Sequence, residues 1–223
     1  MTAKPPSPRI CLNHAGASPS SKSVVDRAVA HLKLEQTVGG YAAARDVADE
    51  LESVYESVAN LIQARSKSEV ALVESATVAW TRAFYSMMEQ QLKKNRNYQG
   101  VILISEAEYA ANVVAASEWA RNHGWSVLAI PSTKTKDGAS TGVVDLEALH
   151  SMLSGTYEYH IGGENVLLDP ERIAIACITH VPTNSGIVNP AQEIGQLLHE
   201  YNLKHGTDSE PQIFYLVDAC QVR

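Results

Sequence analysis

The chain has 223 residues, of which 45% are hydrophobic and 19% charged, and its formal net charge is −7 at pH 7. These values are typical of a globular protein with one good-sized core. The negative charge gives no electrostatic reason to expect nucleic acid or an acidic membrane as a partner. No apolar run reaches the length of a membrane span, and the three cysteines are widely spaced without a Cys-x-x-Cys pair. We therefore expect a cytoplasmic protein with neither a disulfide framework nor a metal site.

The N-terminal part is expected to be helical. Residues 1–9 contain three prolines and predict a short disordered lead-in. Serines within 18–23 can cap a helix over 24–38, which Gly39 and Gly40 end. A second helix is expected over about 42–64, where apolar residues form one stripe.

From residue 70 onward the pattern alternates between short apolar runs and helical segments. The runs are 70–73, 101–104, 126–130, 172–179 and 213–217. The helical segments are about 77–93, 111–122, 145–153 and 189–205. Short strands buried on both faces and followed by helices predict an α/β fold, with a mostly parallel sheet and helices on both faces.

Three further expectations concern the organisation of this part. Residues 154–170 fit no helix or long strand and are expected to be a loop or small hairpin. Asn189 and Pro190 should open the last helix, with Gln192 completing a capping arrangement and Gly206 ending it. No linker divides the chain, so we expect one domain over 10–223.

Ligands of open parallel sheets bind beyond the carboxyl ends of the strands. After the first run, residues 74–77, which include Ala76 and Thr77, open a helix. Its backbone N–H groups and the Thr77 hydroxyl suit a phosphate, or the segment is a plain N-cap. After the second run, Tyr109 is either a ring that lies flat on a planar cofactor or an ordinary loop tyrosine.

Two more segments follow the later runs. Residues 179–186 are a polar turn, whose Pro, Asn and Gly residues also suit a purely structural turn. Asp218 ends the last run, and a carboxylate there needs a partner. That partner is a protonated ring nitrogen in one interpretation and an arginine in the other.

Together these segments resemble the class V aminotransferases, a group of pyridoxal-phosphate (PLP) enzymes of fold type I that includes cysteine desulfurases and isopenicillin-N-epimerase-like proteins. The resemblance begins at Leu-Asn-His-Ala-Gly (12–16) and is most specific in Thr-His-Val-Pro-Thr-Asn-Ser-Gly-Ile-Val-Asn-Pro (179–190) and Val-Asp-Ala-Cys-Gln (217–221). Gly-Gly-Tyr at 39–41 resembles the epimerase-like and C–S lyase members.

The resemblance implies a role for each residue of a cofactor site. Asp218 would pair with the pyridinium nitrogen of PLP and Gln221 would donate to the phenolic oxygen, which Thr183 or Asn184 would also approach. Tyr109 stands where desulfurases carry a ring-stacking histidine that also transfers protons. The complete set of implied cofactor residues is Ala76, Thr77, Tyr109, Thr183, Asn184, Asp218 and Gln221.

The family's Schiff-base lysine follows the Asp-x-x-Gln segment, whereas this sequence ends at Arg223. We therefore expect the N-terminal part of a PLP enzyme that acts on small amino acids, truncated before that lysine and inactive as this chain. Desulfurase, C–S lyase, epimerase-like and transaminase activities all stay open, and the complete form is expected to be a homodimer. Alternatively, the chain is a non-catalytic binding or interaction protein derived from that fold.

Overall fold

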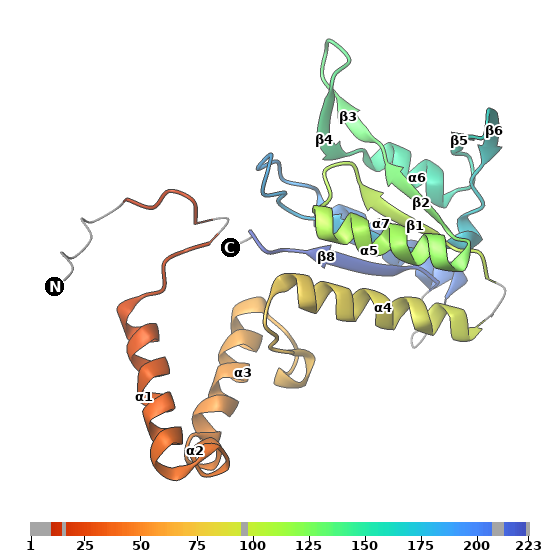
Figure 1. Ribbon diagram of the computed structural model, residues 1–223. Coiled ribbons are helices and arrows are strands. Elements are labelled where there is room, and N and C mark those ends of the chain that lie inside the picture. The colour runs from red at the N-terminus through yellow and green to blue at the C-terminus, as the bar shows by residue number, and fades with distance from the viewer. Residues whose placement is uncertain (1–9, 15–16, 95–97, 207–211, 222–223) are drawn as a thin grey trace. The chain divides into compact units, whose positions relative to one another are not determined.

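The computed structural model describes residues 10–14, 17–94, 98–206 and 212–221 (Figure 1). The lead-in expected over 1–9 lies outside these residues. Cα packing divides the chain into two compact units, residues 1–72 and 73–223. Residues 10–223, for which we expect one domain, thus span two units, and each is described by itself.

The first unit is helical. It contains α1 (Lys22–Val38), α2 (Gly40–Asp46), α3 (Ala48–Ile62) and the 3-10 helix η1 (Lys67–Glu69). Ser21 caps α1 by accepting a hydrogen bond from the backbone N–H of Val24, as the serine cluster predicts. Gly39, with φ of 83°, ends α1 and leads directly into α2.

The prediction of one helix over 42–64 is wrong, because the chain leaves helical geometry at Val47 (φ −112°, ψ 14°). The N–H of Val47 still donates to Ala43 O at 3.2 Å, and the N–H of Leu51 donates to Val47 O at 3.0 Å. The four-residue spacing of the apolar stripe therefore continues across the break, and the sequence pattern does not reveal it.

The second unit carries the alternating part of the chain. Its elements are α4 (Ala76–Lys94), β1 (Val101–Ser105), α5 (Ala110–His123), β2 (Ser126–Ile130), β3 (Ser132–Lys134), β4 (Ser140–Val144), α6 (Leu146–Leu153), β5 (Glu158–Ile161), β6 (Glu164–Leu167), η2 (Pro170–Arg172), β7 (Ile173–Thr179), α7 (Ala191–His205) and β8 (Phe214–Asp218). Four strands form a sheet in the order β2-β1-β7-β8, and every neighbouring pair is parallel. The predicted α/β fold with a parallel sheet is confirmed.

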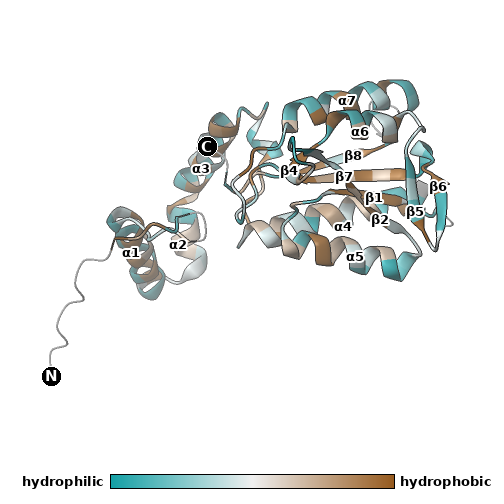
Figure 2. Cartoon of the chain, turned by 90° about the horizontal axis from the view of Figure 1, so that it is seen from above, coloured by the Kyte–Doolittle hydropathy of each residue, from teal (hydrophilic) through white to brown (hydrophobic). Residues whose placement is uncertain are grey.

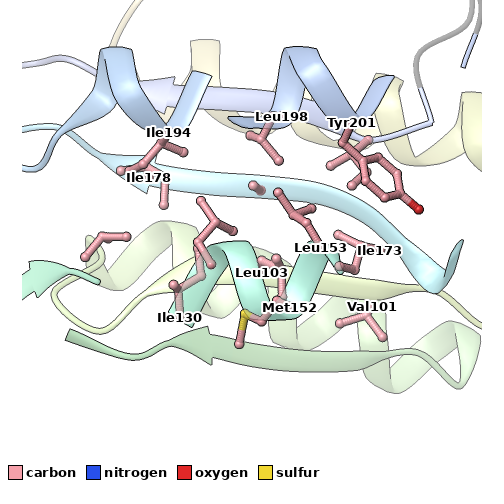
Figure 3. Close-up of a cluster of buried hydrophobic side chains, with 14 of the residues drawn as sticks. Val101, Leu103, Ile130, Met152, Leu153, Ile173, Ile178, Ile194, Leu198 and Tyr201 are labelled. Carbon is pink, nitrogen blue, oxygen red and sulfur yellow. The ribbon is translucent and has the colours of Figure 1, made fainter. Parts of the chain in front are cut away.

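Side chains of the two central strands alternate between two cores, as expected for strands buried on both faces. Leu103 and Ile178 point into the core that α6 and α7 cover (Figure 3). Ile102 and Cys177 point into the other core, together with apolar residues of α4 and α5. Figure 2 shows the apolar strands between the two pairs of helices. Helices on both faces of the sheet are thus confirmed.

The prediction of a strand over 70–73 is wrong. These residues have no strand partner in the part of the chain that the structure describes, and Leu72 is 48% exposed. A strand needs a neighbouring strand to satisfy its backbone hydrogen bonds, and a short apolar run does not show whether such a neighbour exists.

Two antiparallel hairpins accompany the sheet. The hairpin β5–β6 lies within 154–170, where a loop or small hairpin is expected. The hairpin β3–β4 was not predicted, because its strands consist mostly of Ser, Thr, Lys and Gly and give no apolar run. No helix of the described residues has the length and apolarity needed to cross a membrane.

Candidate functional site

The carboxyl ends of three neighbouring strands carry polar side chains. β1 ends at Ser105, β7 at Thr179 and β8 at Asp218, and Thr179 and Asp218 lie opposite each other in the β7–β8 register. Because the strands are parallel, these ends lie at the same edge of the sheet, where ligands of such sheets bind.

Glu108, in the loop after β1, accepts hydrogen bonds from several of these groups. Its Oε2 accepts from the Ser105 hydroxyl at 2.8 Å and from the Thr179 backbone N–H at 2.9 Å. Its Oε1 accepts from the Asn112 side-chain amide at 2.9 Å, from the Tyr109 backbone N–H at 3.1 Å and from the Thr179 hydroxyl. One carboxylate therefore joins the ends of β1 and β7 to the first turn of α5.

Asn112 extends this network to β8. It lies in the first turn of α5, and only 1% of its surface is exposed. Its Nδ2 donates to Glu108 Oε1 at 2.9 Å and to Asp218 Oδ2 at 3.1 Å. The two amide hydrogens of one side chain thus connect two carboxylates.

Asp218 is held at both carboxylate oxygens. Oδ2 accepts from Asn112, and Oδ1 accepts from the backbone N–H of Cys220 at 3.1 Å. The ion pairs of the described residues do not include Asp218, so an arginine partner, the alternative considered from the sequence, is not found there. The carboxylate at the end of this strand is instead held by neutral donors.

Tyr109 lies directly beside the network. It is the N-cap residue of α5, and its backbone N–H donates to Thr179 Oγ1 at 3.3 Å as well as to Glu108. Its side chain is free to face a ligand, because the residue is 45% exposed.

The loop after β7 is fixed by Asn189, which is 1% exposed. Its Nδ2 donates to Thr179 O at 2.8 Å, and its Oδ1 accepts from the Val144 N–H at 2.9 Å. The predicted capping role for this residue is wrong: the N-cap of α7 is Pro190, which has no side-chain cap. The side chain of Asn189 bonds backbone groups of two other segments instead of the N–H groups at the start of α7. Thr183 and Asn184 lie exposed at the turn of this loop.

Ala76 and Thr77 form the exposed first turn of α4, which Ser75 caps by accepting from the Val78 N–H at 3.2 Å. Near the other end of α4, Gln91 Nε2 donates to Ala174 O, at the start of β7, at 3.2 Å. It also donates to Gln212 O, just before β8, at 3.0 Å. Helix α4 therefore runs antiparallel to the strands, and its first turn lies toward their carboxyl ends (Figure 1).

Hydrogen bonds thus join Tyr109 and Asp218, among the predicted site residues, through Glu108, Thr179 and Asn112. Gln221 lies partly buried three residues beyond Asp218. That these residues bind one cofactor together with Ala76, Thr77, Thr183 and Asn184 stays a prediction. Glu108 and Asn112 were not predicted as site residues. The available signal was a polar side chain at position 112 on a helix face that otherwise carries Ala115, Ala116 and Trp119.

A second carboxylate of the same loop, Glu106, contacts the β3–β4 hairpin. Its Oε2 accepts from the Ser132 hydroxyl at 2.5 Å and from the Ser140 hydroxyl at 2.9 Å. The hydrogen bond from Ser132 is the main reason that the pKa of Glu106 lies below its ordinary value of 4.5, and partial burial opposes this shift. Glu106 therefore fastens the hairpin to the loop after β1.

We expect the Glu106 contact to make the stability of this unit depend on pH. A pKa that is lower in the folded than in the unfolded chain stabilises the fold above the unfolded value, and this contribution is lost as the pH falls through the folded pKa. Glu106→Gln should therefore reduce the loss of stability between pH 7 and pH 3, by at most about 1 kcal/mol because the group is mostly in contact with solvent. Urea denaturation at both pH values measures this, with Glu164→Gln in β6 as control. Equal pH dependence in Glu106→Gln and the unmodified chain would contradict the assignment.

A hollow of about 640 Å³ lies in the first unit, lined by Val24, Arg27, His31, Leu51 and Val54 among others. It contains none of the predicted cofactor residues. We place the candidate site at the strand ends, because polar side chains from separate elements meet there.

The sequence model of the family described as aminotransferase class-V matches residues 10–214. The chain therefore belongs to the class-V aminotransferase family. It is 26% identical over 217 residues to a probable cysteine desulfurase of Synechocystis, an alignment that covers 96% of this chain and 43% of that protein. It is 24% identical over 214 residues to a cysteine desulfurase of Wigglesworthia glossinidia brevipalpis, and this alignment covers 94% of this chain and 46% of that protein.

Solved structures of this fold are similar as well. A NifS-like protein superposes with a TM-score of 0.69 at 16% identity, over 94% of this chain and 48% of that one. A mutant of C-DES with glycine covalently linked to its PLP cofactor gives a TM-score of 0.68 at 15% identity, over 94% of this chain and 46% of that one. At such identities the likeness establishes the fold. The chain spans less than half the length of these relatives.

Proposed function

We propose that the chain carries the front part of a PLP site in a cysteine desulfurase-like enzyme that acts on a small amino acid. The observation that carries the proposal is the Asp218 carboxylate, which lies at the carboxyl end of β8 and is held there by the Asn112 amide and the Cys220 N–H. A carboxylate held by neutral donors at this edge is suited to a cationic ring nitrogen.

The donor set at the strand ends fits the chemical groups of PLP. Asp218 offers the anion for the pyridinium, and the first turn of α4 offers backbone N–H groups and the Thr77 hydroxyl for the phosphate. The exposed Tyr109 offers an aromatic face for the ring.

Each residue then has a distinct task. Asp218 keeps the proton on the ring nitrogen, and Gln221 donates to the phenolic oxygen with Thr183 or Asn184 nearby. Ala76 and Thr77 hold the phosphate. When bound, PLP supplies an electron sink for negative charge at the α-carbon of an amino acid, and the protein supplies position and protonation.

The relatives support cysteine or a similar sulfur amino acid as the substrate. The curated relatives are named cysteine desulfurases, and one solved structure is described as the cystine C–S lyase C-DES with its product cysteine persulfide. Tyr109 stands where the resemblance implies a histidine, and at neutral pH a tyrosine is a weaker proton acceptor than an imidazole. A C–S lyase-like reaction, with proton transfer by another group, therefore belongs to the proposal beside desulfuration.

We also propose that this chain binds PLP reversibly and does not turn over substrate. All of its lysines precede Asp218, the last being Lys204 in α7, on the core-covering helix rather than in the segment beyond β8. For the whole enzyme, we further propose that it forms a homodimer and acts in the cytoplasm.

Equilibrium dialysis of the purified chain against PLP tests the proposal, followed by borohydride reduction and peptide mass spectrometry. We expect saturable binding with a dissociation constant in about the micromolar to millimolar range, weaker binding of pyridoxal, which lacks the phosphate, and no single modified lysine. Release of sulfide or alanine from cysteine should not occur. Absence of saturable PLP binding would favour the non-catalytic interaction protein, whereas one modified lysine with turnover would refute reversible binding.

A further inference from the structure

Glu108 uses all of its acceptor capacity within the protein. An ionised carboxylate has about four lone-pair sites, and five donor groups of Ser105, Tyr109, Asn112 and Thr179 point at this one. Its acceptor sites are therefore taken by protein groups and not offered to a ligand. Glu108 therefore acts on the site only through the groups that it holds.

The most consequential of these groups is the Asn112 amide. Its Nδ2 faces Glu108 Oε1 and Asp218 Oδ2. The reversed amide would point its oxygen at two carboxylates, so the two acceptors fix its orientation. Glu108 thus sets the position of Asn112, and Asn112 sets the position of the Asp218 carboxylate.

Asp218, in contrast, keeps acceptor capacity for a ligand. In the hydrogen bonds described above, the Asn112 amide and the Cys220 N–H occupy two of its about four lone-pair sites. No Lys, Arg or His side chain within the described ranges forms an ion pair with Glu108 or Asp218. Two connected carboxylates, with no cationic partner in this part of the chain, create a local field that favours a cation at the remaining acceptor sites of Asp218.

We infer that Glu108 and Asn112 are positioning residues, which orient Asp218 and add negative charge so that the protonated ring nitrogen of PLP is selected. This inference rests on the proposed function, since it concerns the same site. It explains why the polar side chain of Asn112 is buried at the start of an otherwise apolar helix face.

Comparing the binding of two ligands distinguishes a positioning role of Glu108 and Asn112 from a general loss of structure in the variants. PLP has the ring nitrogen, whereas its 1-deaza analogue carries a C–H in that place and cannot pair with Asp218. Glu108→Gln, which preserves the side-chain volume, and Asn112→Ala should each weaken PLP binding about tenfold, the effect of losing one hydrogen bond to a charged group. Binding of the deaza analogue should change less than twofold. Glu106→Gln, in the same loop but bonded to the β3–β4 hairpin, should leave both ligands unaffected.

A measurement without cofactor tests whether the Asn112 amide connects Glu108 and Asp218. In spectra of chain labelled with ¹⁵N-asparagine, the Asn112 side-chain amide is the signal pair that Asn112→Ala removes. Asp218→Asn and Glu108→Gln should each shift this pair, and Glu106→Gln should not.

The outcomes are distinguishable. Equal weakening of both ligands, or an Asn112 amide that does not respond to Asp218→Asn, overturns the positioning role. If the unmodified chain binds neither ligand, the proposed function fails and the selection of a ring nitrogen fails with it. The amide signals then still decide whether Glu108 and Asp218 are coupled.

Discussion

Asp218→Asn is expected to weaken PLP binding by about tenfold to a hundredfold, because a charge-assisted hydrogen bond to the ring nitrogen is lost. The substitution preserves size but removes the anion. It also creates a conflict within the protein, since both present partners of the carboxylate, the Asn112 amide and the Cys220 N–H, are donors. One of them must then face the new amide nitrogen.

Equilibrium dialysis of the variant against PLP measures this effect, with thermal melting to establish that the variant is folded. Asp137→Asn, in the exposed turn between β3 and β4, is the control and should bind PLP like the unmodified chain. Unchanged PLP affinity in Asp218→Asn would show that the ring nitrogen lies elsewhere.

Phe84→Ala is expected to lower the free energy of unfolding by about 3–5 kcal/mol, because it leaves a cavity in a packed core. Phe84 is fully buried between α4 and the sheet. Its ring stacks on Trp80, with 4.9 Å between centroids, and meets Trp119 edge to face at 6.5 Å. The loss therefore removes both apolar burial and aromatic contacts.

Urea denaturation followed by far-UV circular dichroism measures this loss. Leu203→Ala, on the exposed face of α7, is the control and should change stability by less than about 0.5 kcal/mol. A loss below about 1 kcal/mol for Phe84→Ala would show that α4 does not pack against the sheet as described.

The alternating part of the fold was predictable, because buried strands are recognisable in the sequence as runs of apolar residues. The strand over 173–179 is buried at every position, so its residues read as one apolar run. The cap of α1 at Ser21, within the serine cluster, was likewise predictable, because capping is a local interaction between neighbouring residues.

The errors have the opposite origin, since each depends on contacts between distant segments. Whether residues 70–73 form a strand depends on a neighbour that the run itself does not encode. Asn189 was expected to cap a helix because of its neighbours, yet its side chain bonds Val144, 45 residues away in the sequence.

In the candidate site, too, residues marked by their local sequence were predictable, and residues defined by contacts with distant segments were not. Asp218 and Tyr109 could be predicted as site residues, because each follows an apolar run and because the family resemblance points to them. Glu108 and Asn112 could not be predicted in this way, because their roles depend on hydrogen bonds to residues 71 and 106 positions away in the sequence. A hydrogen-bond network between distant segments is only weakly indicated by the local sequence, here by a polar residue on an apolar helix face.

A crystal structure of this chain with PLP tests the central claim most directly. We expect the ring nitrogen within about 2.7–2.9 Å of an Asp218 carboxylate oxygen, the usual length of a charge-assisted hydrogen bond. The phosphate should lie at the backbone N–H groups of Ala76 and Thr77. A ring nitrogen that faces solvent, or a phosphate bound away from the first turn of α4, would contradict the account.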